Sequence, residues 1–197
     1  QEMQRLKILI SSMLNLTKFD NGTIEIHYQL FPIQDLAFRT ILMFESRLEK
    51  RNITLEGLDS EPVQVWGDPD LIGQVIYNLF ENATKFVNTG GTITFTFKDE
   101  PNNTSIAIRN TGAGISKEEL PKIFERFYKS DDSRSHDKTG LGIGLDITKH
   151  IVRLHKAQIS VSSEEGEYTE FLIRLPKKDA PAESPTENPE KQPKDAR

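Results

Sequence analysis

The sequence of 197 residues contains no cysteine, a single tryptophan and no excess of positive charge. Without cysteine there can be no disulfide scaffold, no thiolate zinc site and no cysteine nucleophile. Thirty acidic residues against 25 basic ones give a formal net charge of −5, which argues against a domain that coats nucleic acid. No apolar run approaches the roughly 18 residues that a membrane-spanning helix needs. The chain has neither an initiator methionine nor a signal-peptide pattern, so we expect a soluble piece of a longer protein that binds no nucleic acid.

The two ends of the chain differ in composition from its centre. Residues 177–197 contain no aromatic residue and no aliphatic residue larger than alanine, and a proline recurs every four residues from Pro181. We predict a disordered tail here, with a polyproline-type docking peptide as the alternative. Residues 1–19 are predicted to form a helix that ends in a turn at 20–22, with a narrow apolar stripe of Leu6, Leu9, Ile10, Met13 and Leu16. Such a stripe indicates a helical bundle whose partner helix lies outside these residues or on another chain.

The centre of the chain, residues 23–176, is predicted to be one α+β domain of two layers. Alternating apolar residues predict a first strand over 23–30, with Ile24, Ile26, Tyr28 and Leu30 half-buried. A helix is predicted from Pro32 to Arg51, and its inward face should carry Leu36, Ile41, Leu42, Phe44 and Leu48. The other predicted elements are strands at 53–58, 63–66, 92–98, 104–109, 158–163 and 169–175, helices at 68–87 and 141–155, and an irregular stretch with short helical pieces at 111–139.

The helix predicted over 68–87 carries the most informative polar pattern. Asp68 followed by Pro69 is typical of a helix start. Asn78, Asn82 and Lys85 follow one another at spacings of four and three, so they lie along the edge of the apolar face. An amide oxygen suits Mg²⁺, and a lysine one turn further could reach the same phosphates. The alternative is a solvated polar stripe that happens to hold two asparagines.

Two glycine clusters frame an aromatic segment further along. Residues 110–115 read Asn-Thr-Gly-Ala-Gly-Ile after a strand, and residues 140–145 read Gly-Leu-Gly-Ile-Gly-Leu at the start of a helix. Glycines at a helix N-terminus leave amide groups for anions, although the pattern is neither a P-loop nor a dinucleotide fingerprint. Between them, residues 124–129 read Phe-Glu-Arg-Phe-Tyr-Lys ahead of a polar run, which suggests an aromatic-anchored lid or, alternatively, a plain surface loop.

The order of these motifs resembles the ATP-binding catalytic domain of sensor histidine kinases. The resemblance covers about residues 68–176 and implies the GHKL or Bergerat fold, a two-layer α/β sandwich shared with type II topoisomerases, heat-shock chaperones and mismatch-repair ATPases. Residues 1–22 resemble the second helix of the dimerisation bundle with the link that leaves it. The implied cofactors are ATP and Mg²⁺.

The resemblance also implies a role for each matching residue. Asn82 would ligate Mg²⁺, and Lys85, Arg126 and Lys129 would be the catalytic cations. Asn110 would sit under the adenine amino group, with Thr169 nearby, and backbone amides of the second glycine cluster would hold the phosphates. The implied nucleotide-binding set is Asn78, Asn82, Lys85, Phe86, Asn110, Gly112, Gly114, Ile115, Phe127, Gly140, Leu141, Gly142, Gly144, Leu145 and Thr169.

Two positions depart from the family pattern. The family usually has Asp where this chain has Asn110, so the hydrogen bond from the adenine amine loses its charge assistance and we expect weaker recognition. The family usually has a second glycine where Tyr168 stands, so we expect a differently shaped turn. These departures leave open a pseudokinase that has lost nucleotide, while another ATPase of the same fold would need a carboxylate base at the place of Asn78.

A histidine kinase needs a histidine to phosphorylate, and the sequence offers four. His27 copies the spacing from acceptor histidine to proline but lacks the acidic neighbour, and His136, His150 and His155 are expected to be surface or structural residues. The resemblance implies that ATP phosphorylates a histidine on a first bundle helix outside this chain, that the chain alone does not autophosphorylate, and that an Asp on a response-regulator receiver domain is the next acceptor. It further implies homodimerisation through the bundle and a cytoplasmic domain of a bacterial sensor whose membrane anchor lies upstream.

Overall fold

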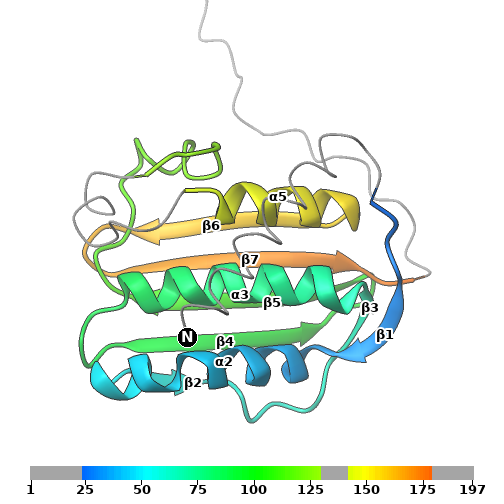
Figure 1. Ribbon diagram of the computed structural model, residues 1–197, viewed down its shortest axis with the longest axis horizontal. Coiled ribbons are helices and arrows are strands. Elements are labelled where there is room, and N and C mark those ends of the chain that lie inside the picture. The colour runs from blue at the N-terminus through cyan, green and yellow to red at the C-terminus, as the bar shows by residue number, and fades with distance from the viewer. Residues whose placement is uncertain (1–23, 130–141, 179–197) are drawn as a thin grey trace, which may run out of the picture.

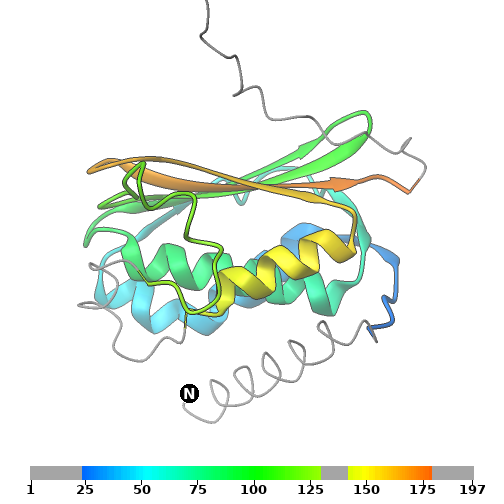
Figure 2. The same cartoon turned by 90° about the horizontal axis from the view of Figure 1, so that it is seen from above.

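The computed structural model describes residues 24–129 and 142–178, which form a domain of two layers (Figures 1 and 2). Three helices cover one face of a five-stranded sheet: α2 (Ile33–Lys50), α3 (Pro69–Phe86) and α5 (Gly144–Leu154). The strand order is β2 (Thr54–Glu56), β4 (Thr92–Asp99), β5 (Asn103–Thr111), β7 (Tyr168–Pro176) and β6 (Gln158–Glu164). The short strands β1 (Gln29–Pro32) and β3 (Gln64–Gly67) pair with each other. The α+β prediction is confirmed, whereas the helix predicted over 1–19 and the tail beyond 178 lie outside the described residues.

The sheet is antiparallel except at one edge, where β2 runs parallel to β4. Side chains alternate along the strands, so one face packs against the helices and the other faces away from them. The covered face carries the buried Phe95, Ile106, Ile108 and Ile173, which pack with the apolar faces of α3 and α5. This core fixes the helices over the sheet and thereby the polar residues along their edges.

The strand predicted over 23–30 is wrong for most of its length. Residues 24–28 are not in a strand, and β1 begins only at Gln29. The reason is that the His27 N–H donates to a side chain, Asp68 Oδ2 at 2.9 Å, and the Tyr28 ring stacks on Trp66 with centroids 5.8 Å apart. Leu30, predicted to be half-buried, is 63% exposed.

One side chain of α2 also lies opposite to its predicted place. Leu42 was predicted to point inward and is 69% exposed, whereas the predicted Phe44 and Leu48 are buried beside Ile33 and Ala37. Two residues along a helix correspond to a rotation of about 200°, so Leu42 and Phe44 cannot share one face.

Several boundaries differ by a few residues from those predicted. Asn110 lies within β5, α5 begins at Gly144 and β2 has three residues. The described part of the irregular stretch, 112–129, contains turns and no helix.

Helix α3 is anchored firmly at its start, as the sequence predicts. The Oδ1 atom of Asp68 accepts hydrogen bonds from the N–H groups of Asp70 and Leu71, at 3.0 and 3.2 Å. The N–H of Asp68 itself donates to Nε2 of the buried His155, at 3.1 Å. Because Nε2 accepts this bond, Nδ1 carries the proton and donates to the carbonyl of Ile151, at 2.8 Å. His155 is therefore a structural residue, which is one of the two roles that the sequence allowed it.

The other end of α3 is capped by Arg51. Its Nη1 donates to the carbonyl of Thr84 at 2.7 Å, and its Nη2 donates to the carbonyl of Val87 at 2.5 Å. A cation at a helix C-terminus satisfies carbonyls that lack partners within the helix and interacts favourably with the helix dipole. Both ends of the helix that bears Asn82 are thus fixed by side chains, Asp68 at its own N-cap and Arg51 from the end of α2.

We expect the stability of the domain to fall as the pH drops below about 6.5, the ordinary pKa of histidine. Burial lowers the pKa of His155, so the unfolded chain binds this proton more readily than the folded one. The stabilisation that neutral His155 gives is fully present above the pKa that His155 has in the unfolded chain. It is lost as the pH falls towards the lower pKa that His155 has in the folded domain. Thermal unfolding of the parent and of His155→Gln between pH 7.5 and 5 tests this, because glutamine can accept the Asp68 N–H bond but does not titrate. A shallower pH dependence is expected for His155→Gln. Equal pH dependences of unfolding for the parent and the variant would contradict the assignment.

Candidate functional site

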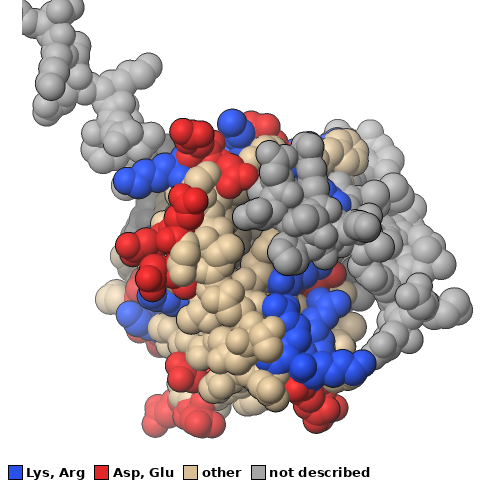
Figure 3. Space-filling model, turned by 90° about the vertical axis from the view of Figure 1, so that its left-hand side faces the viewer, with Lys and Arg blue, Asp and Glu red and all other residues tan. Residues whose placement is uncertain are grey.

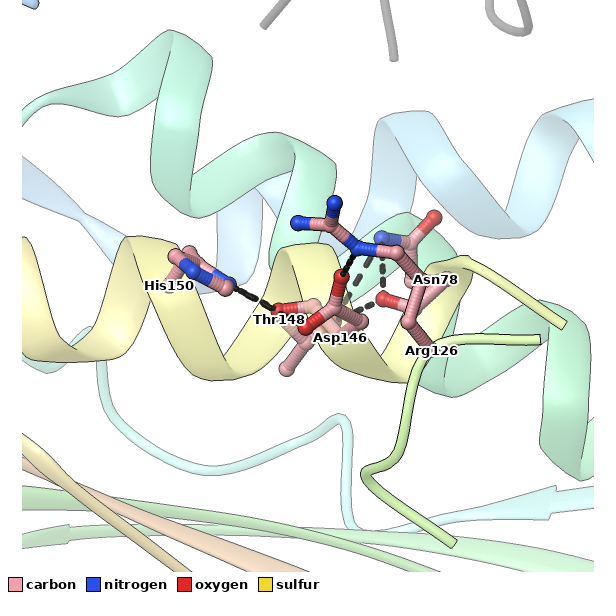
Figure 4. A network of polar contacts seen from close by, with 6 residues as sticks. Asn78, Arg126, Asp146, Thr148 and His150 are labelled. Carbon is pink, nitrogen blue, oxygen red and sulfur yellow. Dashed lines mark hydrogen bonds and ion pairs between the residues drawn. The ribbon is translucent and has the colours of Figure 1, made fainter. Parts of the chain in front are cut away.

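Asn78 joins α3 to the start of α5 (Figure 4). The side chain is buried, and its Nδ2 donates to the carbonyl of Gly144 at 3.0 Å and to Oγ1 of Thr148 at 3.4 Å. Thr148 in turn donates to the same carbonyl, at 2.9 Å. The family resemblance put Asn78 in the implied nucleotide-binding set; the structure adds a role in holding two helices together, through a threonine that the sequence did not single out.

Asn82 and Lys85 lie further along the same helix and are half-buried. Lys85 Nζ forms an ion pair with Glu81 Oε1 at 3.2 Å, one turn back. Among residues 24–129 and 142–178, the Asn82 amide takes part in no hydrogen bond, and no cluster of three or more His, Asp or Glu could hold a metal ion. The amide oxygen of Asn82 therefore fits the single neutral protein ligand that Mg²⁺ accepts when phosphates and water complete its octahedron. Phe86, next to Lys85, is half-buried at the end of the helix.

Asn110 and Thr169 sit side by side on the helix-covered face of the sheet. They are register partners on β5 and β7 and are 4% and 6% exposed. Asn110 Nδ2 donates to the carbonyl of Thr111 at 3.1 Å, whereas no described residue donates to its Oδ1. The structure thus brings Asn110, which the family resemblance places under an adenine amino group, next to Thr169, which it places near the adenine. The side-chain oxygen of Asn110 has no donor from the described residues.

The glycine doublet that follows β5 is packed tightly between two other segments. A Cβ at Gly112 would lie 2.1 Å from the carbonyl oxygen of Phe86, and one at Gly114 would lie 2.2 Å from that of Glu164. The backbone at Gly114 is also left-handed, with φ +71°. The Ile115 N–H donates to Oγ of Ser163 at 2.8 Å, which ties the loop to the β6–β7 hairpin. Ser163, which also lies 3.0 Å from Oγ1 of Thr169, is a site residue that sequence reasoning missed.

Tyr168 lies on the sheet face away from the site. It begins β7 opposite Thr111 and Glu164, and the Arg109 guanidinium carbon lies 3.7 Å from the centre of its ring. Arg109 is exposed between the buried Ile108 and Asn110, so the pair belongs to the uncovered face. The substitution of glycine by tyrosine therefore places no side chain among Asn110, Thr169 and their neighbours.

The start of α5 is held against the end of the aromatic segment. The Phe127 N–H donates to the carbonyl of Gly142 at 3.0 Å, and both residues have positive φ, +65° and +67°. The Phe127 ring is 68% exposed. Ile143, at the N-cap position, offers no side-chain cap to the first amides of α5. Gly144 and Leu145 open the helix and are half-buried, while Gly140 and Leu141 lie outside the described residues.

Arg126 is paired with a carboxylate that the sequence did not point to. Its Nε lies 2.9 Å from Oδ2 of Asp146, in the first turn of α5, and Nδ1 of His150 lies 3.3 Å from Oδ1 of the same carboxylate (Figure 4). Lys129 is half-buried at the edge of the described residues and has interaction partners of its own.

Basic side chains gather at the ends of α2 and α3 nearest to Asn82. Arg47 and Lys50 stand in the last turn of α2, Arg51 follows it, and Lys85 stands in the last turn of α3. Figure 3 views the molecule from this end and shows a compact area of Lys and Arg on it. Such a field favours an anionic ligand at this end of the helices.

The comparisons with known proteins point to one family. Residues 67–179 match the family described as histidine kinase-, DNA gyrase B-, and HSP90-like ATPase. The sensor protein SrrB of Staphylococcus aureus (strain NCTC 8325 / PS 47) is 32% identical over 177 residues, which cover 89% of this chain and 30% of SrrB. The chain thus spans less than a third of the length of the curated relatives that it matches.

Two solved structures share the fold. Full-length ShkA in complex with AMPPNP has a TM-score of 0.73 at 21% identity, covering 87% of this chain and 36% of ShkA. Histidine kinase ThkA in complex with response regulator protein TrrA has a TM-score of 0.67 at 24% identity, covering 89% of this chain and 48% of ThkA.

Proposed function

Because the chain belongs to the family of histidine kinase-, DNA gyrase B- and HSP90-like ATPases and carries the catalytic domain of a sensor histidine kinase, we propose that it binds Mg²⁺-ATP between α3, the start of α5 and the β5–β7 pair. The observation that carries the proposal is that the side chains of Asn82 and Asn110 have polar atoms without a hydrogen-bond partner among the described residues. The Asn82 amide and Oδ1 of Asn110 receive no hydrogen bond from the described residues, although Asn110 is 4% exposed. Neither group is among the completely buried side-chain atoms that lack a partner, so both are open to a ligand instead of being used by the fold, and a bound nucleotide would supply their partners.

At the phosphate end, Asn82 would hold Mg²⁺, which supplies positive charge to the phosphates. Backbone N–H groups at Gly142 and Gly144 would donate to phosphate oxygens, as the first amides of a helix do. Lys85 and Lys129 are the proposed cations around the transferred group. Phosphoryl transfer needs positioning and charge compensation more than covalent chemistry from the protein, and these groups provide both.

At the base end, Asn110 would accept a hydrogen bond from the adenine amine through Oδ1. Its Nδ2 is already committed to the carbonyl of Thr111, which fixes the amide so that Oδ1 is the atom available to a ligand. Thr169, Gly112, Gly114 and Ile115 would line the same pocket. A neutral acceptor gives a weaker bond than the carboxylate usual in the family, about 0.5–1.5 instead of 1.5–3 kcal/mol.

For the whole protein we propose that an imidazole nitrogen attacks the γ-phosphorus and that the phosphoryl group then passes to an Asp of a response regulator. We propose that this acceptor is none of the described histidines: His27 lies in the segment before β1, His150 lies on α5, and His155 is the C-cap of α5 with both ring nitrogens bonded to the backbone. We therefore expect no autophosphorylation by these 197 residues alone. We also propose dimerisation through the helical bundle and a membrane anchor upstream. Among residues 24–129 and 142–178, none of the helices has the length and hydropathy of a transmembrane segment.

Calorimetric titration of the chain with ATP, in the presence of Mg²⁺ and then of EDTA, tests the nucleotide site. We expect saturable binding that chelation weakens, and a loss of at least about tenfold in Mg²⁺-dependent affinity for Asn82→Ala, because one metal ligand disappears. Asn88→Ala is the matched control, since Asn88 is an exposed asparagine just beyond the same helix. Absence of binding at millimolar nucleotide, or equal affinity of both variants and the parent, would sink the proposal.

A further inference from the structure

The first turn of α5 contains a carboxylate that is almost completely covered. The side chain of Asp146 is 9% exposed, and its Oδ2 faces Arg126. Its Oδ1 lies 3.3 Å from Nδ1 of His150, which lies closer, at 2.9 Å, to the backbone carbonyl of Asp146 (Figure 4). A carboxylate with so little access to water is costly unless a cation compensates it. Arg126 carries a positive charge at every relevant pH, and its Nε lies 2.9 Å from Oδ2.

This carboxylate stands where the proposed site needs positive potential. Asp146 is two residues from Gly144, whose backbone is a proposed phosphate donor and whose carbonyl Asn78 holds. A negative charge in the first turn stabilises a helix, but beside a triphosphate the same charge is repulsive. Neutralising Asp146 is therefore a condition for binding phosphates at this helix start.

Arg126 is built into the fold in a way that suits this task. Its Nε, the guanidinium nitrogen nearest the backbone, is the atom that meets Asp146, so the side chain must lie across the start of α5. The next residue, Phe127, is fixed by the hydrogen bond from its N–H to Gly142. The backbone bond at Phe127 and the contact of Arg126 Nε together keep the guanidinium of Arg126 beside the carboxylate of Asp146.

We infer that Arg126 acts on nucleotide binding through Asp146, as a positioning residue that neutralises this carboxylate, and not as a cation that touches the phosphates itself. The inference rests on the proposed nucleotide site and refines it: Lys85 and Lys129 remain the cations for the phosphates. It replaces the direct catalytic role that the family resemblance suggested for Arg126.

A suppressor experiment separates the two roles. Arg126→Gln should weaken Mg²⁺-ATP binding by about tenfold, because it leaves the carboxylate uncompensated. Asp146→Asn, alone or combined with Arg126→Gln, should bind within about threefold of the parent, since no charge then needs compensation. Arg126→Lys should also stay near the parent. The deficit of Arg126→Gln should shrink as salt is raised, because salt screens repulsion.

Arg153→Gln, in the last turn of α5, removes the same charge at the far end of the helix and serves as the control. If the double variant binds as weakly as Arg126→Gln, Arg126 contacts the phosphates directly and the inference is overturned, while the nucleotide site stands. If the parent itself does not bind Mg²⁺-ATP, both the proposed nucleotide site and the inference on Arg126 are wrong. Should Arg126→Gln fail to fold, a double variant that folds and binds would support the inference, and one that does neither would overturn it.

Discussion

Replacing Gly114 by alanine is expected to destabilise the domain by about 3 kcal/mol, the largest effect of a single methyl group that we predict. A left-handed backbone costs an L-residue roughly 1–2 kcal/mol. The new Cβ would also lie 2.2 Å from the carbonyl oxygen of Glu164, so the loop must move away from the hairpin. That movement lengthens the hydrogen bonds from Ile115 N–H to Ser163 and from Gly166 N–H to Ala113, each worth about 1 kcal/mol. Urea unfolding measures the loss.

Gly166→Ala is the matched control for this prediction. Gly166 has a similar φ, +80°, and stands in the adjacent hairpin, but nothing lies within 4 Å of the position of its Cβ. It should therefore lose only the cost of the left-handed backbone, roughly 1 kcal/mol. If the two variants had the same free energy of unfolding, the close approach of the Gly114 loop to Glu164 would not contribute to stability, and the prediction would be wrong.

Asn78→Asp is expected to cost about 3 kcal/mol although the two side chains have the same shape. The aspartate has no N–H to give to the Gly144 carbonyl or to Thr148, so it faces two groups that were hydrogen-bond acceptors. The Thr148 hydroxyl is the one donor within reach, and turning it to the carboxylate would break its bond to the Gly144 carbonyl. A buried charge with so few donors carries most of the cost of its desolvation. Asn82→Asp, the same change one turn further on a half-buried residue, should cost less than about 1 kcal/mol.

Thermal or urea unfolding of both variants tests this difference, and equal losses would refute it. The prediction also bears on the other ATPases of this fold. Those that act through a carboxylate at the place of Asn78 would need a different partner for α5, because here that place is occupied by a donor which α5 requires.

The sequence predicted those parts of the site that are encoded locally. The cap at Asp68, the edge positions of Asn82 and Lys85, and the glycines around 112–115 depend on neighbours within one or two turns, and the structure has the cap where it was predicted. The family resemblance implied that Asn110 and Thr169 lie near the same adenine, and the structure has them as register partners on β5 and β7.

What could not be predicted are hydrogen bonds between a side chain and the backbone of a residue far away in the chain. Ser163 holds a loop 48 residues away, and His155 receives the N–H of a residue 87 positions earlier. Serine and histidine in such positions look like ordinary surface residues in a sequence, because only the assembled layers show what faces them. The strand predicted over 23–30 was wrong for the same reason: the alternation was real, but the His27 N–H found a side-chain acceptor instead of a strand.

The order of the strands has a consequence for how the domain assembles. Two antiparallel pairs, β4 with β5 and β6 with β7, join neighbours in the chain across short turns, so they can form within microseconds. Pairing of the central strands, β5 and β7, must instead close a loop of the 56 residues from 112 to 167. Closing a longer loop costs more conformational entropy and is slower. Asn110 and Thr169 are opposite each other in that pair. We therefore expect the part of the proposed adenine site that Asn110 and Thr169 form to be completed in the slowest step of folding, after both hairpins have formed.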